Sequence, residues 1–183
     1  MKPIIIKYKT EHGVRERILL FLLGEVIPIH ARLYEKRQPW GLRMEDLMTY
    51  PKGTLGRELG MFLRDEELQP VPKVERHDAF HILLDFSTHI YDEAAMQFYL
   101  IGNGKISPFT VGTAVFAGMM LPDQWGYFRR QFARGRVARS IAKWNFKELL
   151  NENFTDLKKN INHQPVNNPD LLQKLAQFDK IDK

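Results

Sequence analysis

A chain of 183 residues with 44% hydrophobic residues is long enough to bury a substantial core, and this length favours a single domain. The sequence has no cysteine, which excludes disulfides, iron–sulfur clusters and zinc sites built from thiolates. Its longest mainly apolar runs, residues 18–23 and 111–121, are shorter than the roughly 20 residues that cross a bilayer, so the pattern argues against a transmembrane protein.

The first half of the chain predicts helices separated by turns and prolines. Residues 15–34 carry apolar side chains at helical spacing, and residues 39–41 predict a turn. Thr54 is a candidate N-cap, and Pro70 and Pro72 end the helix that it begins. The apolar face of that helix holds Leu55, Leu59, Phe62 and Leu63.

Residues 77–100 predict two helices with a break at residues 86–88. In one continuous helix, Glu93 would lie about 120° around the axis from His81. A break avoids this, because Ser87 or Thr88 could cap a second helix from about residue 89 to residue 100. Glu93 would then lie near the start of that helix, close to the preceding histidines.

The second half also predicts helices. Residues 102–104 form a turn, residues 110–120 are rich in small side chains that allow close helix packing, and residues 146–161 predict short helical pieces. A polar linker at residues 163–169 precedes a last short helix, which Asn168 and Pro169 open. We therefore predict an all-α fold, with a single helical domain over residues 1–162 and a linker plus C-terminal helix over residues 163–183.

A cluster of histidines and carboxylates points to a metal site. His77 and His81 lie four apart on one helical face, Asp78 lies beside them, and Glu93 follows after eleven intervening residues. Two imidazoles with carboxylates and no thiolate suit a divalent metal such as zinc, ferrous iron or manganese. His89, four residues before Glu93, could reach the same cluster.

The net charge of +5 is concentrated in one segment. Residues 125–147 contain no acid and seven bases: Arg129, Arg130, Arg134, Arg136, Arg139, Lys143 and Lys147. Such a stripe attracts phosphate, although a solvated helix face is the better explanation of the charge taken alone. Interleaved aromatic residues favour a membrane-interface role, and no nucleic-acid motif accompanies the stripe, so we expect no nucleic-acid partner.

The spacing His77-Asp78-x-x-His81 followed by Glu93 resembles the motif of the coenzyme Q biosynthesis protein 4 family. Residues 51–58 resemble the glycine-rich start of a helix in that family, and residues 133–136 resemble its Gly/Arg segment. Residues 144–161 resemble its terminal helices. The matches run in the same order over roughly residues 15–162.

The resemblance implies a helical bundle with a divalent metal, usually zinc, held by His77, Asp78, His81 and Glu93 between consecutive helices. It also implies a polyprenylated aromatic lipid as substrate, which members are proposed to decarboxylate and hydroxylate on the ring. Expected partners are the membrane surface, other quinone-biosynthesis proteins and a second copy of the chain. The expected location is cytoplasmic, peripheral to the inner membrane.

Two further groups of residues follow from this expectation. Arg129, Arg130, Arg134 and Arg136 would bind anionic headgroups or a substrate carboxylate. An apolar groove for the prenyl chain would be lined by Phe80, Phe98, Val115, Phe116 and Met119, all of which could equally be core residues. Asp85 and Asp92 stand where the family usually has glycine, and they could lie near the metal.

Two other functions fit parts of the sequence. A non-catalytic lipid-binding protein that organises other enzymes would use the metal structurally. A metal-dependent phosphohydrolase would suit the adjacent His77 and Asp78, but it also needs an upstream histidine and a downstream aspartate. His12, His30 and Asp123 are the available residues, and their placement is unconvincing.

Overall fold

The computed structural model describes residues 39–72 and 74–180, and this part of the chain contains eight α-helices, one short 3-10 helix and no β-strand. The all-α prediction is therefore confirmed. The helix expected at residues 15–34, and with it His12 and His30, lie outside the described residues. The elements are α2 (Met44–Leu47), α3 (Leu55–Asp65), α4 (Glu75–Leu84), α5 (Ile90–Gly102), α6 (Pro108–Met120), η1 (Pro122–Gln124), α7 (Trp125–Val137), α8 (Phe154–Ile161) and α9 (Pro169–Asp179).

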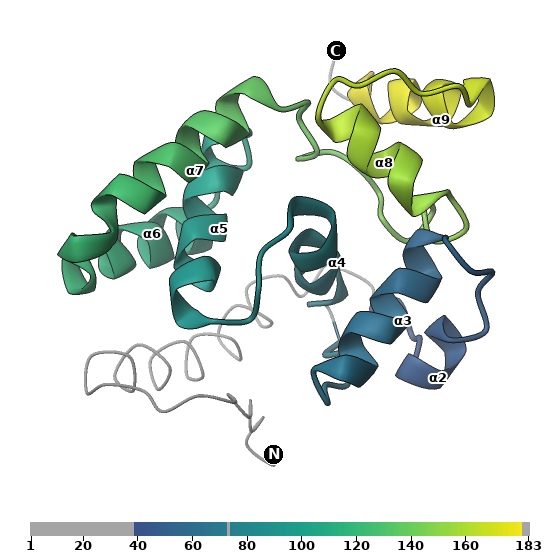
Figure 1. Cartoon of the computed structure of the whole chain (residues 1–183), viewed down its shortest axis with the longest axis horizontal. Helices are drawn as coiled ribbons and strands as arrows, with labels where there is room; N and C mark the ends of the chain where they lie inside the picture. The colour runs from purple at the N-terminus through teal and green to yellow at the C-terminus, as the bar shows by residue number, and fades with distance from the viewer. Residues whose placement is uncertain (1–38, 73, 181–183) are drawn as a thin grey trace.

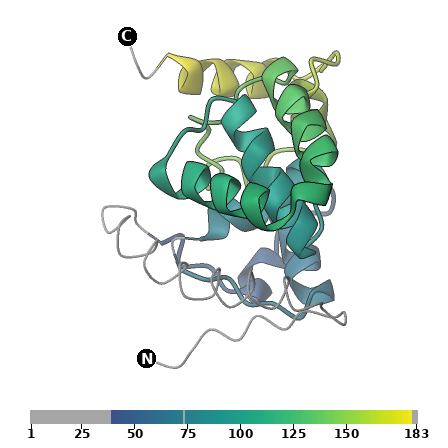
Figure 2. The same cartoon turned by 90° about the vertical axis from the view of Figure 1, so that its left-hand side faces the viewer.

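Helix α4 occupies the centre of the described structure (Figure 1). It packs against α3 and α8 on one side, while α5, α6 and α7 form a second group on the other side. Figure 2 shows α6 and α7 from outside, with α5 behind them. None of the described helices is both long and apolar enough to span a bilayer.

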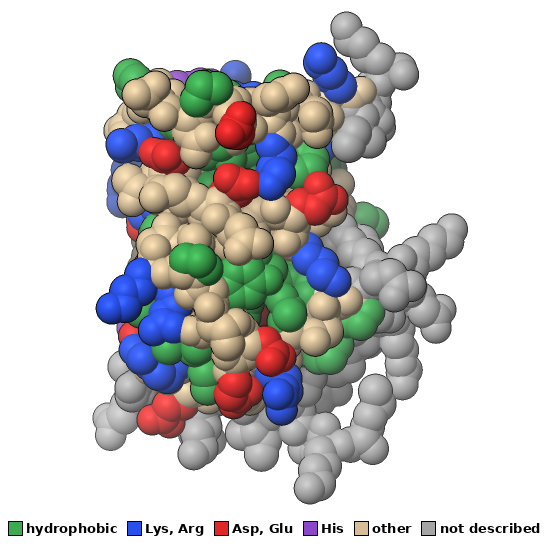
Figure 3. Space-filling model, turned by 90° about the vertical axis from the view of Figure 1, so that its right-hand side faces the viewer, with side chains coloured by type: hydrophobic (Ala, Val, Ile, Leu, Met, Phe, Trp, Pro, Cys, Tyr) green, Lys and Arg blue, Asp and Glu red, His purple; other side chains and the backbone are tan. Residues whose placement is uncertain are grey.

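The central position of α4 follows from side chains that are buried around much of its circumference. Ala79, Phe80, Leu83 and Leu84 are all buried, and Phe80 packs edge-to-face against Phe146 with ring centroids 5.5 Å apart. Burial of each of the larger side chains, Phe80, Leu83 and Leu84, stabilises the fold by about 1.5–3 kcal/mol relative to an exposed one. By contrast, the face of the molecule over α8, α9, α2 and α3 is a mixed surface of acidic, basic and apolar side chains (Figure 3).

Helices α5 and α7 cross at unusually close range, and glycines make this possible. A Cβ atom at Gly135 would lie 2.1 Å from the carbonyl oxygen of Tyr99, and one at Gly102 would lie 2.2 Å from that of Phe132. Buried Asn103 fastens the crossing: its amide donates to the carbonyl of Gly135 at 3.2 Å and accepts from the backbone of Ile141 at 2.8 Å. The two helices therefore form a rigid pair.

The predicted helix starts are mostly confirmed. The Thr54 side chain accepts from the backbone N–H of Arg57 at 3.4 Å, and Asn168 accepts from that of Leu171 at 3.1 Å with Pro169 in the first turn. Helix α9 then contributes Leu171, Leu175 and Phe178 to the common hydrophobic core.

The break at residues 86–88 is also confirmed, but the predicted cap is wrong. His89 is the N-cap of α5, and it has no side-chain capping hydrogen bond. Neither Ser87 nor Thr88 caps the helix, because Ser87 bonds the side chain of Asp92 and Thr88 donates to Glu66 at 2.8 Å.

Candidate metal centre

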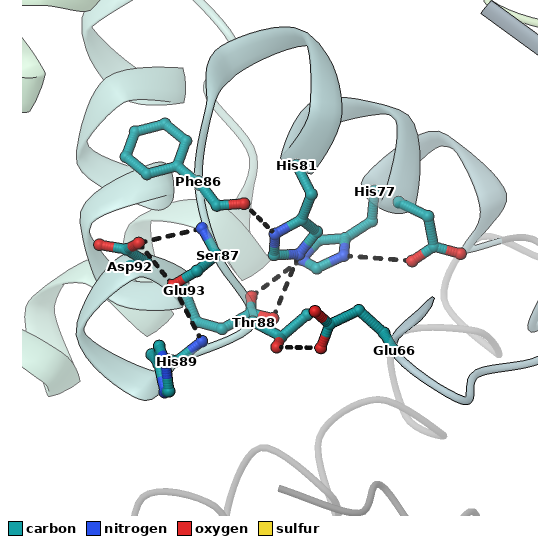
Figure 4. A network of polar contacts seen from close by, with 10 residues as sticks. Glu66, His77, His81, Phe86, Ser87, Thr88, His89, Asp92 and Glu93 are labelled. Carbon is teal, nitrogen blue, oxygen red and sulfur yellow. Dashed lines mark hydrogen bonds and ion pairs between the residues drawn. The ribbon is translucent and has the colours of Figure 1, made fainter. Parts of the chain in front are cut away.

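Two histidines of α4 and one glutamate of α5 meet at the junction of these helices (Figure 4). The Nε2 atoms of His77 and His81 lie 3.2 Å from Oε2 and Oε1 of Glu93, respectively. The two imidazole rings are 4.8 Å apart and steeply inclined, at 71°. The break between α4 and α5 thus brings Glu93 to the histidine face, as the sequence predicts.

The donor atoms suit a divalent metal in chemistry, and Glu93 lies at a suitable distance from each imidazole. One ligand atom from each of His77, His81 and Glu93 can be chosen so that all three lie within 4.8 Å of one another. With bonds of about 2.1 Å, the donors around a tetrahedral zinc ion lie about 3.4 Å apart, close to the 3.2 Å from Glu93 to each imidazole. Three protein ligands would leave a fourth position for water or a substrate.

His81 is held firmly in the orientation that a ligand needs. It is buried, its Nδ1 lies 3.1 Å from the carbonyl oxygen of Phe86, and its ring stacks on Phe62 with centroids 5.6 Å apart. A proton on Nδ1 would donate to that carbonyl and leave Nε2 free to bind a cation. The ring of His81 is therefore held by a hydrogen-bond partner at its edge and by an aromatic ring on its face.

The cluster is an ion pair when no cation is bound. Burial by itself would lower the pKa of His77, but the negative charge of Glu93 and the neighbouring Asp78 raise that pKa to about 10. Burial opposes ionisation of Glu93, yet the two imidazoles hold the pKa of its carboxyl well below the ordinary value. A metal ion must therefore displace the proton that His77 holds at neutral pH.

Asp78 and His89 lie at the edge of the cluster. Oδ1 of Asp78 is 3.7 Å from Nδ1 of His77, on the side of the imidazole away from the nitrogen that faces Glu93. This arrangement suits a carboxylate that orients a ligand histidine, and direct ligation by Asp78 stays a prediction. His89 is exposed at the start of α5 and does not belong to the group of three donors.

Asp85 and Asp92, which were expected to lie near the metal, bind other partners. Asp85 ends α4 with a φ of 58°, a left-handed conformation in which glycine is favoured and aspartate is tolerated, and its side chain pairs with Lys158 of α8. Asp92 accepts from Ser87 and from the hydroxyl of Tyr127. Burial opposes its ionisation, but these hydrogen bonds lower the pKa of Asp92. Neither carboxylate belongs to the donor group.

The four predicted binding arginines do not lie in one environment. Arg129, Arg130 and Arg136 are exposed on α7, whereas Arg134 is half-buried. The guanidinium of Arg134 lies over the rings of Phe86 and Tyr99 and donates to the carbonyl of Leu84 at 2.6 Å. Sequence spacing alone could not separate Arg134 from its neighbours.

The residues of the expected prenyl groove are similarly divided. Phe80 is buried against Phe146, and Phe98 stacks on Phe128 at 4.7 Å. Val115 and Met119 are 56% and 67% exposed on the outer face of α6. The groove stays a prediction, because its expected lining is shared between the core and the surface.

Among solved structures, the fold is similar to that of a protein from Nostoc punctiforme PCC 73102 whose name provisionally assigns it to ubiquinone biosynthesis. The two share 18% sequence identity with a TM-score of 0.56, over 82% of each chain. At this identity the likeness establishes a common fold. No protein-family model and no curated protein matches the chain.

Proposed function

We propose that this chain acts in ubiquinone biosynthesis on a polyprenylated aromatic precursor, and that His77, His81 and Glu93 hold a divalent metal, most simply Zn²⁺, with Fe²⁺ or Mn²⁺ as alternatives. The observation that carries the proposal is the approach of Glu93 to both imidazoles at 3.2 Å across the α4–α5 junction. The shared fold with the Nostoc protein supports the choice of pathway.

A bound metal would supply a Lewis acid able to polarise a carboxylate or phenolate of an aromatic ring. The side chains of His77 and His81 are 30% and 2% exposed, so solvent reaches the cluster from the His77 side. A substrate head group would approach from that side, while His81 anchors the site to the core. The reaction we favour replaces the ring carboxyl by a hydroxyl and releases carbon dioxide, which is a two-electron oxidation. Zinc cannot accept these electrons, so dioxygen would serve as the oxidant, acting directly on the substrate or through a redox-active metal in place of zinc.

The outer faces of α6 and α7 support association with a lipid surface. Val111, Val115 and Met119 recur every four residues on α6 and are all exposed. Exposed Arg129, Arg130 and Arg136 lie on α7 and would attract anionic headgroups. We propose that this side meets the cytoplasmic membrane face, where a second copy or other quinone-biosynthesis proteins would also assemble.

The metal claim is tested with two histidine variants. Wild-type protein is expected to carry about one divalent metal per chain, and His81→Ala is expected to lose it because two donors hold a metal poorly. His89→Ala is the matched control, since His89 is exposed and outside the donor group. Full retention of metal by H81A would contradict the proposal. Mass spectrometry of lipid extracted from the same preparations would identify a prenylated aromatic ligand.

Burial of His81 between Phe62 and the core favours one alternative, a lipid-binding organiser whose metal is structural. Such a protein would lose folding stability when a chelator removes its metal, and it would show no turnover of the co-purified lipid. An enzyme would convert that lipid once metal and any co-reactant are restored. Turnover assays on metal-replete protein therefore separate the two functions.

A further inference from the structure

Asp92 joins three segments of the chain beside the candidate metal centre. Its Oδ1 accepts from the hydroxyl of Tyr127, in the first turn of α7, at 2.7 Å. Its Oδ2 accepts from the backbone N–H of Ser87 at 2.9 Å and from the Ser87 hydroxyl at 2.6 Å. Figure 4 shows Asp92 beside Ser87 in the connection that leads from His81 to Glu93. Both carboxylate oxygens thus accept hydrogen bonds from residues outside the group of three metal-ligand candidates.

Asp92 immediately precedes Glu93 in the first turn of α5. Fixing its carboxylate fixes the rotation of this turn, and with it the direction in which the Glu93 side chain leaves the helix. The first turn needs such a restraint, because the N-cap His89 makes no side-chain capping hydrogen bond.

Helix α7 also holds the other end of the connection. The guanidinium of Arg134 donates to the carbonyl of Leu84, the last residue of α4, at 2.6 Å. Tyr127 and Arg134 therefore hold the end of α4 and the start of α5 against one rigid helix. The crossing of α5 and α7 at Gly102 and Gly135 makes that helix a fixed reference.

We propose that Tyr127, acting through Asp92, is a positioning residue that sets Glu93 at the distance from His77 and His81 that metal binding requires. The inference rests on the proposed metal site. Side chains that orient metal ligands typically change metal affinity by about 10–100-fold when they are removed. Deleting the Tyr127 hydroxyl should have an effect in this range, because the hydroxyl donates to a charged carboxylate.

The test compares Tyr127→Phe with Tyr50→Phe, which removes a hydroxyl from a half-buried tyrosine outside the Asp92 network. Zn²⁺ affinity is measured by competition with a chelating dye, and the visible spectrum of the Co²⁺-loaded protein reports ligand geometry. We expect Y127F to bind Zn²⁺ about 10–100-fold more weakly and to show an altered Co²⁺ spectrum. Y50F should match wild type in both measurements.

The outcomes distinguish this inference from the proposed function. Wild-type protein that binds no metal would overturn both. Metal binding that H81A abolishes and Y127F leaves unchanged would overturn only the positioning role. Should Y127F fail to fold, Ser87→Ala decides, because it removes the Asp92 hydrogen bond at 2.6 Å, together with a longer contact to the His89 N–H at 3.3 Å, and leaves the backbone contact to Asp92. A several-fold loss of affinity in S87A supports the inference, and an unchanged affinity overturns it.

Discussion

The inner and outer faces of α7 use similar residues for different purposes. On the inner face, Arg134 bonds the end of α4, Tyr127 bonds Asp92, and Gly135 touches the backbone of α5. On the outer face, Arg129, Arg130 and Arg136 are exposed. The sequence presents these arginines as one basic stripe, and the structure divides them into a structural residue and a charged surface.

The division shows why charge along a helix is a poor guide to function. A half-buried guanidinium must have partners, and Arg134 has both a carbonyl and two aromatic faces. An exposed guanidinium is hydrated and available to an anion. The following predictions test this contrast, beginning with the single substitution that should have the largest effect on stability.

The largest effect is expected when a methyl group is added to the helix crossing. Gly135→Ala would place Cβ against the carbonyl of Tyr99, a main-chain atom that cannot move aside, so we expect a loss of about 3 kcal/mol in the free energy of unfolding. Gly112→Ala is the control on the outer face of α6, where a Cβ atom would meet nothing within 4 Å. It should stabilise the helix by about 0.5–1 kcal/mol. Urea unfolding measures both, and equal effects would refute the contrast.

A smaller effect is expected when the guanidinium is removed from each face. Arg134→Met leaves the Leu84 carbonyl without its charged donor, which should cost about 2 kcal/mol of folding stability. Arg129→Met on the exposed face should change stability by less than about 0.5 kcal/mol. In vesicle-binding assays the order should reverse, with R129M losing more affinity for anionic lipid. A large stability loss in R129M would contradict the assignment of Arg129 to the outer surface.

The third prediction concerns the inward-facing ion pairs of the metal centre, in contrast to the exposed arginines of α7. The pKa of His77 is raised from 6.5 to about 10, so in metal-free protein its contribution to stability is complete below about pH 6.5 and is lost as the pH rises toward 10. The lowered pKa of Glu93 means that its contribution is present above about pH 4.5 and is lost in acid.

The free energy of unfolding of chelator-treated protein should therefore fall between pH 7 and pH 10, by at most about 1.4 kcal/mol per pH unit. His77→Gln should flatten this dependence, since glutamine can still donate to Glu93 but does not titrate. An identical slope in both proteins would show that His77 is not the titrating group.

Local features of the sequence predicted much of the helical structure and part of the site. Thr54 and Asn168 each specify a helix start by accepting a hydrogen bond from the backbone N–H three residues later. The break after α4 was predicted because only a break could bring Glu93 back to the histidines. The predicted cap of α5 was wrong because the Ser87 hydroxyl donates to Asp92 and accepts from the backbone N–H of His89, which is itself the N-cap. The Phe62–His81 stack and the Tyr127–Asp92 hydrogen bond join distant parts of the chain, so no local sequence pattern could predict them.

The sequence by itself determined where the helices lie and which side chains of α4 share a face, because helix geometry and capping depend on residues within a few positions of one another. Only the tertiary structure decided which arginine of α7 turns inward and which carboxylate faces the histidines. Those outcomes depend on the crossing of α5 and α7 and on the left-handed turn at Asp85, where packing between distant segments selects one arrangement among many.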